Sequence, residues 1–282
     1  MRALLLVLLV AACQQDAGPK IALRYHPPTG AVYRYALEQT TRLDMPEASG
    51  PLAGVSRQGM RLRIYSTQTI QGPVDGGGIE VQIVMDSASL VMPNVDMSRQ
   101  LAQLRGSRST AVFDDRFHVL RSDVSALHAA PPEVANQMAA VLNGLAYAFP
   151  AQPVGPGDSW TLSTKLPIEQ FGGVDASKAG NAQTTLTVRE IQVRDADTSV
   201  VLDIKTAFPT GPVELAVAGQ RGSMTLSGEM TGHQTYSISR GTVVDATISG
   251  ETTITMTIPT LGIREMALNT VTSSTLQLTG AP

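Results

Sequence analysis

Hydrophobic and polar residues alternate with a period of two along most of the chain, a pattern typical of half-buried β-strands. In one such segment Ile79, Val81 and Ile83 would share one face, with Glu80 on the other. Clean alternation of this kind predicts antiparallel strands with one face on a core and the other in water. The same period predicts strands at 31–45, 60–70, 79–91, 182–194, 197–208, 222–231, 233–240, 242–258 and 264–278.

Turn-forming residues separate several of these segments. Gly76-Gly77-Gly78 stands between two predicted strands, and Asp114-Asp115 stands inside a predicted hairpin at 109–122. Asp195 and Asp197 flank a further reversal, where aspartate favours turns. These residues are therefore interpreted as turns rather than as paired catalytic carboxylates.

One segment, 131–149, follows a helical period. Pro131 and Glu133 suit the first turn of a helix, and Pro150 would end it. Apolar residues keep helical spacing at Val134, Met138, Val141, Leu142 and Leu145. The opposite face is small and weakly polar, and a helix that is apolar nearly all round is normally buried on more than one side. We therefore expect this helix to pack in the hollow of a curved sheet.

The fold class predicted is mainly β, with one or more strongly curved antiparallel sheets and a main helix. We expect residues 21–282 to form a single β-rich domain of two pseudo-repeats, about 21–150 and 151–282. Gly30 to Tyr35 resembles Gly157 to Leu162, and similar hairpins follow each in the same order. The alternative is one long meander with chance similarities.

The N-terminus has the features of an export signal. One basic residue, Arg2, precedes a short aliphatic run that is too short to span a membrane. Its end, Val10-Ala11-Ala12-Cys13, resembles the bacterial lipobox. The resemblance implies a signal peptide over 1–12, lipid on Cys13 and a lipidated tether over 13–20. Because Cys13 is the only cysteine, the chain has no disulfide framework.

Composition and charge narrow the partners. The chain has 282 residues, of which only 16% are charged, and a net charge of −3. This weak charge argues against a nucleic-acid partner, so the expected partner is the membrane, reached through the lipid on Cys13. By the enterobacterial sorting pattern, Gln14 after the lipidated cysteine favours the outer membrane.

Motifs for common chemistries are missing. The four histidines are scattered at His26, His118, His128 and His233. The sequence contains no P-loop, dinucleotide fingerprint or nucleophile elbow, and one lipid-bearing cysteine cannot build a cysteine-type zinc site. We therefore expect no metal, no cofactor and no enzymatic activity. The open alternative is an enzyme whose active-site residues cannot be grouped from the sequence.

Two resemblances bear on function. Gly157-Asp158-Ser159-Trp160 resembles a turn-then-strand phrase of bacterial lipoproteins. The whole layout resembles, at the level of fold, the periplasmic lipoprotein carriers, in which a curved sheet wraps a helix and leaves a hollow for acyl chains. That resemblance implies a hydrophobic ligand, with four candidate contact residues: Met138, Leu142, Leu145 and Trp160. The alternative function is a structural or interaction lipoprotein without a small ligand, its methionines and Trp160 simply filling a core.

Overall fold

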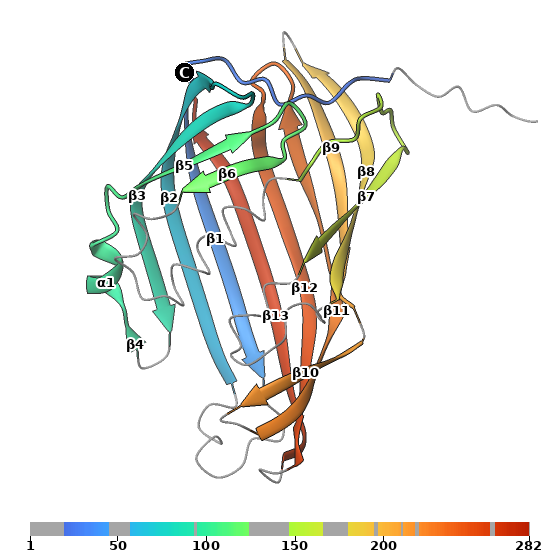
Figure 1. Cartoon of the computed structure of the whole chain (residues 1–282). Coiled ribbons are helices and arrows are strands. Elements are labelled where there is room, and N and C mark those ends of the chain that lie inside the picture. The colour runs from blue at the N-terminus through green and yellow to red at the C-terminus, as the bar shows by residue number, and fades with distance from the viewer. Residues whose placement is uncertain are drawn as a thin grey trace, which may run out of the picture.

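The computed structural model describes residues 20–44, 57–92, 95–123, 147–165, 180–194, 197–209, 211–217, 220–259 and 263–281. The described chain is mainly β and forms one large antiparallel sheet (Figure 1). Its strands are β1 (Val32–Asp44), β2 (Arg57–Pro73), β3 (Ile79–Met92), β4 (Val95–Asp96), β5 (Arg108–Phe113), β6 (Val119–Asp123), β7 (Ser159–Lys165), β8 (Asn181–Arg194), β9 (Asp197–Ala207), β10 (Pro212–Val217), β11 (Gln220–Ser237), β12 (Thr242–Ile258) and β13 (Ile263–Gly280).

The strand order is β6-β5-β3-β2-β1-β13-β12-β11-β9-β8-β7, with β4 paired to β3 and β10 paired to β11. The chain thus meanders outward from β1 to the β6 edge. It then enters at the opposite edge, β7, and meanders back to β13, which pairs with β1 and sets Tyr35 opposite Leu278. The sheet is not closed, because β6 and β7 are its two edges. The prediction of a curved antiparallel sheet is confirmed, and the duplication stays a prediction.

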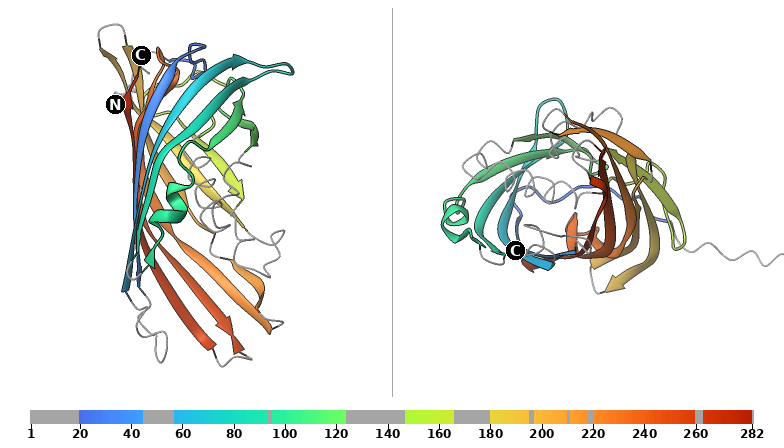
Figure 2. Two further views of the ribbon diagram at one scale, coloured as in Figure 1. Left: turned by 90° about the vertical axis from the view of Figure 1, so that its left-hand side faces the viewer. Right: turned by 90° about the horizontal axis from the view of Figure 1, so that it is seen from below.

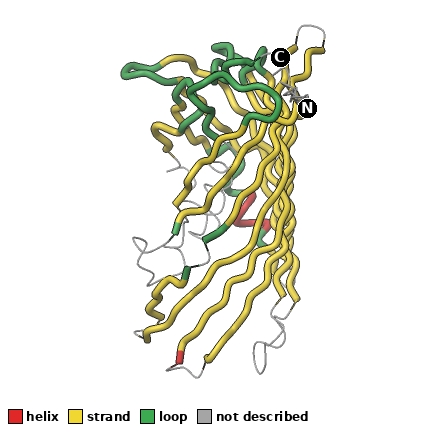
Figure 3. The backbone as a smooth tube through the Cα atoms, turned by 90° about the vertical axis from the view of Figure 1, so that its right-hand side faces the viewer, coloured by secondary structure: helices red, strands yellow, loops and turns green. Residues whose placement is uncertain are grey.

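The sheet curls along its length so that one face is concave (Figures 2 and 3). Glycines on β11 and β12 allow the neighbouring backbones to approach closely. A Cβ at Gly232 would lie 2.0 Å from the carbonyl oxygen of Thr247, and one at Gly250 would lie 2.2 Å from that of Glu229. Glycine in a strand often marks such a bend or close approach, so these positions favour the curl.

Most predicted strands agree closely with the structure. The segments predicted at 79–91 and 242–258 correspond to β3 and β12. The prediction of separate strands at 222–231 and 233–240 was wrong, because β11 runs through Gly232 without a break. Glycine at this position permits the approach of β12 rather than ending the strand.

The predicted helix over 131–149 is not supported. Residues 131–146 lie outside the described residues, and residues 147–149 are irregular. The backbone N–H of Phe149 donates to the carbonyl of Arg116 at 2.8 Å rather than to a helical partner. Phe149 also precedes Pro150, and helical geometry is disfavoured for a residue before proline. In the described ranges the only α-helix is α1 (Ser98–Ala102), of five residues. No described helix is long and apolar enough to cross a membrane.

The main core sits at one end of the sheet, where residues 20–31 cross the concave side (Figure 1). Ile21 forms a two-way bridge with Val154, and the N–H of Gly30 donates to the carbonyl of Ile70 at 2.8 Å. Leu23 in this crossing segment is fully buried. The segment therefore ties the two halves of the sheet together and closes one end of the concave face.

Candidate ligand-binding cavity on the concave face

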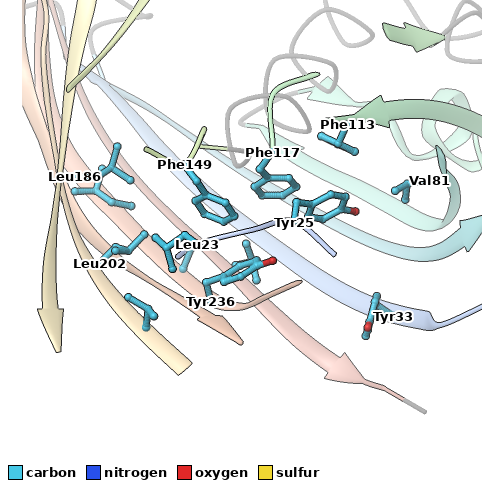
Figure 4. Packing of buried hydrophobic residues seen from close by; sticks show 14 of the residues in the cluster. Leu23, Tyr25, Tyr33, Val81, Phe113, Phe117, Phe149, Leu186, Leu202 and Tyr236 are labelled. Atoms are coloured by element: carbon cyan, nitrogen blue, oxygen red, sulfur yellow. The ribbon is translucent and has the colours of Figure 1, made fainter. Parts of the chain in front are cut away.

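Five aromatic rings pack together at the closed end of the sheet (Figure 4). Tyr25 comes from the crossing segment, Phe113 from the end of β5, Phe117 from the following turn, Phe149 from a loop and Tyr236 from β11. Ring centroids lie 4.5 Å apart between Tyr25 and Phe117, and 4.8 Å apart between Phe149 and Tyr236. Offset and edge-to-face pairs at such distances add to simple burial, so this cluster forms a rigid roof.

The turn after β5 directs Phe117 into the cluster. Asp114 Oδ1 accepts the backbone N–H groups of Arg116 at 2.9 Å and His118 at 2.8 Å, and Oδ2 bonds to His118 Nδ1 at 2.8 Å. Phe117 itself has a φ of 63°, the left-handed region that a bulky residue rarely adopts. The strain is tolerated because the turn and the stacked rings hold the residue from both sides.

The charge of Asp114 is stabilised by this turn. Burial raises the pKa of its carboxyl, but the hydrogen bonds from His118 and from the backbone of Arg116 more than offset burial and leave the pKa below its ordinary value. The predicted turn at Asp114-Asp115 is confirmed as a reversal between β5 and β6.

Beneath the roof lies a cavity of about 70 Å³. Tyr25, Phe113 and Phe117 cover it, and its floor is the concave face of β1, β2, β3, β12 and β13. The floor residues are Tyr35, Leu37, Ile64, Ser66, Gln68, Ile83, Thr242, Val243 and Leu276. The cavity is thus mainly aromatic and aliphatic, with a few hydroxyl and amide groups.

The tyrosine hydroxyls in this region are neutral. Tyr35 hydroxyl lies 2.6 Å from Thr242 Oγ1 and donates to the carbonyl of Val243 at 2.9 Å. Burial raises the pKa of Tyr35 and of Tyr25 well above the ordinary range of tyrosine. Among the described residues, no acidic or basic side chain lines the cavity. It is therefore suited to an uncharged apolar group.

The cavity volume limits what can enter. An apolar cavity of about 150 Å³ accommodates benzene, and this one is about half that size. It would hold the end of a chain, while the remainder of the ligand would lie along the concave face.

Away from the cavity, the concave face of β11, β12 and β13 becomes polar and then apolar again. A band of hydroxyls comes first, including the cross-strand pair Thr252 and Thr270. Three methionines then lie in one row across the strands, because Met224 pairs with Met256 and Met256 pairs with Met266. Met224 is buried, whereas Met256 and Met266 are half-buried. Methionine adapts to irregular apolar partners, so Met256 and Met266 offer a second apolar surface beyond the cavity.

Of the residues proposed from sequence, only Trp160 lies in the described part of the chain, so their grouping stays a prediction. Cys13, Met138, Leu142 and Leu145 lie outside the described residues. Trp160 is half-buried on β7, where its Nε1 donates to the carbonyl of Ala148 at 2.9 Å, and it does not line the cavity.

The roof residues were missed by sequence reasoning. Tyr25, Phe113 and Phe117 stand in a loop, at a strand end and in a turn, so they do not contribute to the alternation that identifies strands. Their one sequence signal is scarcity: aromatic residues make up only 4% of the chain.

The described part of the chain contains no group of three or more histidine, cysteine, aspartate or glutamate side chains that could hold a metal ion. His118 bonds to Asp114 in its turn, and His233 Nε2 lies 3.9 Å from Asp245 Oδ2 on the opposite, exposed face of the sheet.

The described chain is thus an open, curved antiparallel sheet with an uncharged cavity at one end of its concave face. No family model matches the chain, and no curated protein matches it. Among solved structures, the β domain of the Bordetella autotransporter BrkA is similar at 10% sequence identity, covering 88% of this chain and 99% of that one with a TM-score of 0.21. A likeness this low supports no statement about fold or function.

Proposed function

We propose that this chain is a lipid-anchored protein of the bacterial envelope that binds a hydrophobic ligand on the concave face of its sheet. The anchor is the lipid expected on Cys13, and Gln14 favours the outer membrane. The observation that carries the proposal is the cavity under Tyr25, Phe113 and Phe117, with further apolar surface at the methionine row. The role is binding rather than catalysis.

The lining indicates the kind of ligand. An uncharged aromatic and aliphatic pocket favours the end of an acyl or similar chain, because burying a charge there without a partner costs several kcal/mol or more. The hydroxyl band along the concave face would meet a neutral polar part of the same molecule. We therefore expect an uncharged amphipathic lipid rather than a free fatty acid held by its carboxylate.

Mass spectrometry of the full-length protein tests this directly. Lipid bound covalently at Cys13 persists when the protein is denatured, whereas a ligand in the cavity is released. A native mass larger than the denatured mass by one lipid, extracted from membranes or supplied as monopalmitoylglycerol, is the expected result.

A substitution that fills the cavity supplies the control. Ser66 is buried and lines the cavity, so Ser66→Leu should reduce occupancy by monopalmitoylglycerol about tenfold or more. Ser89→Leu, on an exposed position of the neighbouring strand, should leave occupancy unchanged. Equal native and denatured masses for the wild-type protein, even with added lipid, would overturn the proposal and leave a structural or interaction role.

A further inference from the structure

The convex face of the sheet carries a groove of about 560 Å³. It lies on the other side of the sheet from the concave cavity, and Leu37 and Leu276 on β1 and β13 contribute to the lining of both. Cross-strand register places Tyr65 on β2 beside Ala36 on β1, Ala36 beside Gln277 on β13, and Gln277 beside Asp245 on β12. Ala36 is the smallest side chain in this row. The groove therefore lies over Ala36, with Tyr65 as one wall and the polar residues of β13 and β12 as the other.

The next row toward the far end of the strands is also polar. This row crosses β2, β1, β13 and β12, and each strand contributes one residue that lines the groove. In that order the residues are Arg63, Glu38, Thr275 and Thr247. The groove thus combines one aromatic ring with guanidinium, carboxylate, amide and hydroxyl groups.

The charges of the groove are balanced. Glu38 lies 3.3 Å from Arg63 and 3.6 Å from Arg61. Asp245 accepts a hydrogen bond from Thr235 at 3.2 Å and lies 3.9 Å from the ring of His233. A polyanion or a polycation would meet a like charge in such a groove, whereas an uncharged ligand would not.

Several polar groups here are free to bind. The amide of Gln277, the hydroxyls of Thr247 and Thr275, and the hydroxyl of Tyr65 make no side-chain hydrogen bond to any described residue. Tyr65 is 47% exposed, so the face of its ring is accessible to a ligand. An exposed ring flanked by planar amide, carboxylate and guanidinium groups matches a sugar ring, which offers C–H groups to the aromatic face and hydroxyls to the polar groups.

We propose that this groove binds an uncharged glycan chain. A polymer is favoured over a single sugar because polar side chains continue along the same convex face of β12. Hydroxyls lie at Thr247, Ser249, Thr253, Thr255 and Thr257, with the exposed carboxylate of Glu251 between Ser249 and Thr253. At about 3.3 Å per residue these positions extend the polar surface over roughly 33 Å. The groove and the cavity lie on opposite faces, so this proposal stands or falls independently of lipid binding.

Isothermal titration of the full-length protein with defined oligosaccharides tests the glycan site. The protein is kept in a polyoxyethylene detergent, because a detergent with a sugar headgroup would compete. Chitohexaose and maltohexaose are the uncharged probes, and heparin is the polyanionic comparison. Saturable binding of at least one uncharged hexasaccharide, tighter than that of heparin, is the expected result.

Three variants locate the binding. Tyr65→Ala should weaken glycan binding about tenfold, the scale of one lost ring-stacking contact, whereas Tyr65→Phe keeps the ring and should stay within about threefold of the wild type. Ala36→Leu fills the groove without removing a recognising group and should abolish binding. Leu120→Ala, exposed at the β6 edge, is the matched control and should change nothing.

The outcomes decide the matter. Absence of binding by either hexasaccharide at millimolar concentration, preference for heparin, or unaltered affinity in both Tyr65→Ala and Ala36→Leu would each overturn the glycan site. Because Ala36→Leu and Tyr65→Ala act in different ways, failure of one variant to fold leaves the other as a valid test.

Discussion

Replacing the buried side chain of Gln234 on β11 should raise the stability of the protein, although most core substitutions lower it. It points to the concave side between Leu202 on β9 and Ala246 on β12, and it is fully buried. Neither its Nε2 nor its Oε1 has a hydrogen-bond partner among the described residues. Replacing Gln234 with methionine, a side chain of similar length, removes both polar atoms while keeping the core filled.

The magnitude follows from the cost of unsatisfied groups. A buried donor or acceptor without a partner costs about 1–3 kcal/mol. A volume-conserving change in a core usually costs less than about 1.5 kcal/mol. We therefore expect Gln234→Met to raise the free energy of unfolding by about 1–3 kcal/mol, with an increase in Tm of about 2–4 °C for each kcal/mol.

Equilibrium unfolding in urea measures this change, and the denaturant slope should stay the same if the folded and unfolded states keep their compactness. Gln277→Met is the matched control. Gln277 is exposed on β13, so its replacement should alter stability by no more than about 0.5 kcal/mol. If Gln234→Met instead loses more than about 1 kcal/mol while the control stays neutral, the amide is not unsatisfied in solution, and a water or ligand bonds to it.

Two further predictions concern the curl of the sheet and the turn below the aromatic roof. Gly250→Ala should destabilise the protein by about 1–3 kcal/mol in urea unfolding, because the added Cβ would lie 2.2 Å from the carbonyl oxygen of Glu229. A Cβ added at Gly59 would meet no described atom within 4 Å, so Gly59→Ala should be neutral, and equal effects of the two substitutions would contradict the role of Gly250 in the close approach. Asp114→Asn should lower the free energy of unfolding at neutral pH, and the difference from wild type should shrink as the pH falls below about 4. A carboxyl whose pKa is lowered in the folded state stabilises the fold fully only at pH values above the ordinary aspartate pKa, and this stability is lost as the carboxyl is protonated. A difference that stays constant between pH 7 and pH 2 would count against the hydrogen bonds from His118 as its source.

The strands could be predicted from sequence because their period is local. Every second residue of β3 from Val81 to Met85, and of most of β12, faces the core, so alternation is enough to locate these strands. The turn at Asp114 was equally local, because aspartate bonds to backbone groups two and four residues ahead. These features need no knowledge of the partner strand. A bulge at Asp86 reverses the two faces of β3 beyond it, where Leu90 is buried and Val91 is 65% exposed, and alternation alone does not predict this reversal.

The cavity could not be predicted in this way. Its roof comes from Tyr25, Phe113 and Phe117, and its floor includes Thr242 and Leu276 from the other end of the chain. Helical periodicity instead predicted a helix over 131–149 as the lining. Residues 147–149 are irregular, and the backbone N–H of Phe149 donates to the carbonyl of Arg116. The alternation of β11 likewise gave no sign that Gln234 would be buried without a partner.

A two-residue period and turn chemistry act within a few residues, so the β class, the position of most strands and the buried face of their regular stretches follow from the sequence alone. Which strands pair with one another is visible only in the folded structure. The pairing of β1 with β13 places Tyr35 opposite Leu278, and this pairing shapes both the concave cavity and the convex groove. Pairing across such a distance depends on packing that neither strand encodes alone, because any strand with the same alternation could in principle occupy the neighbouring position.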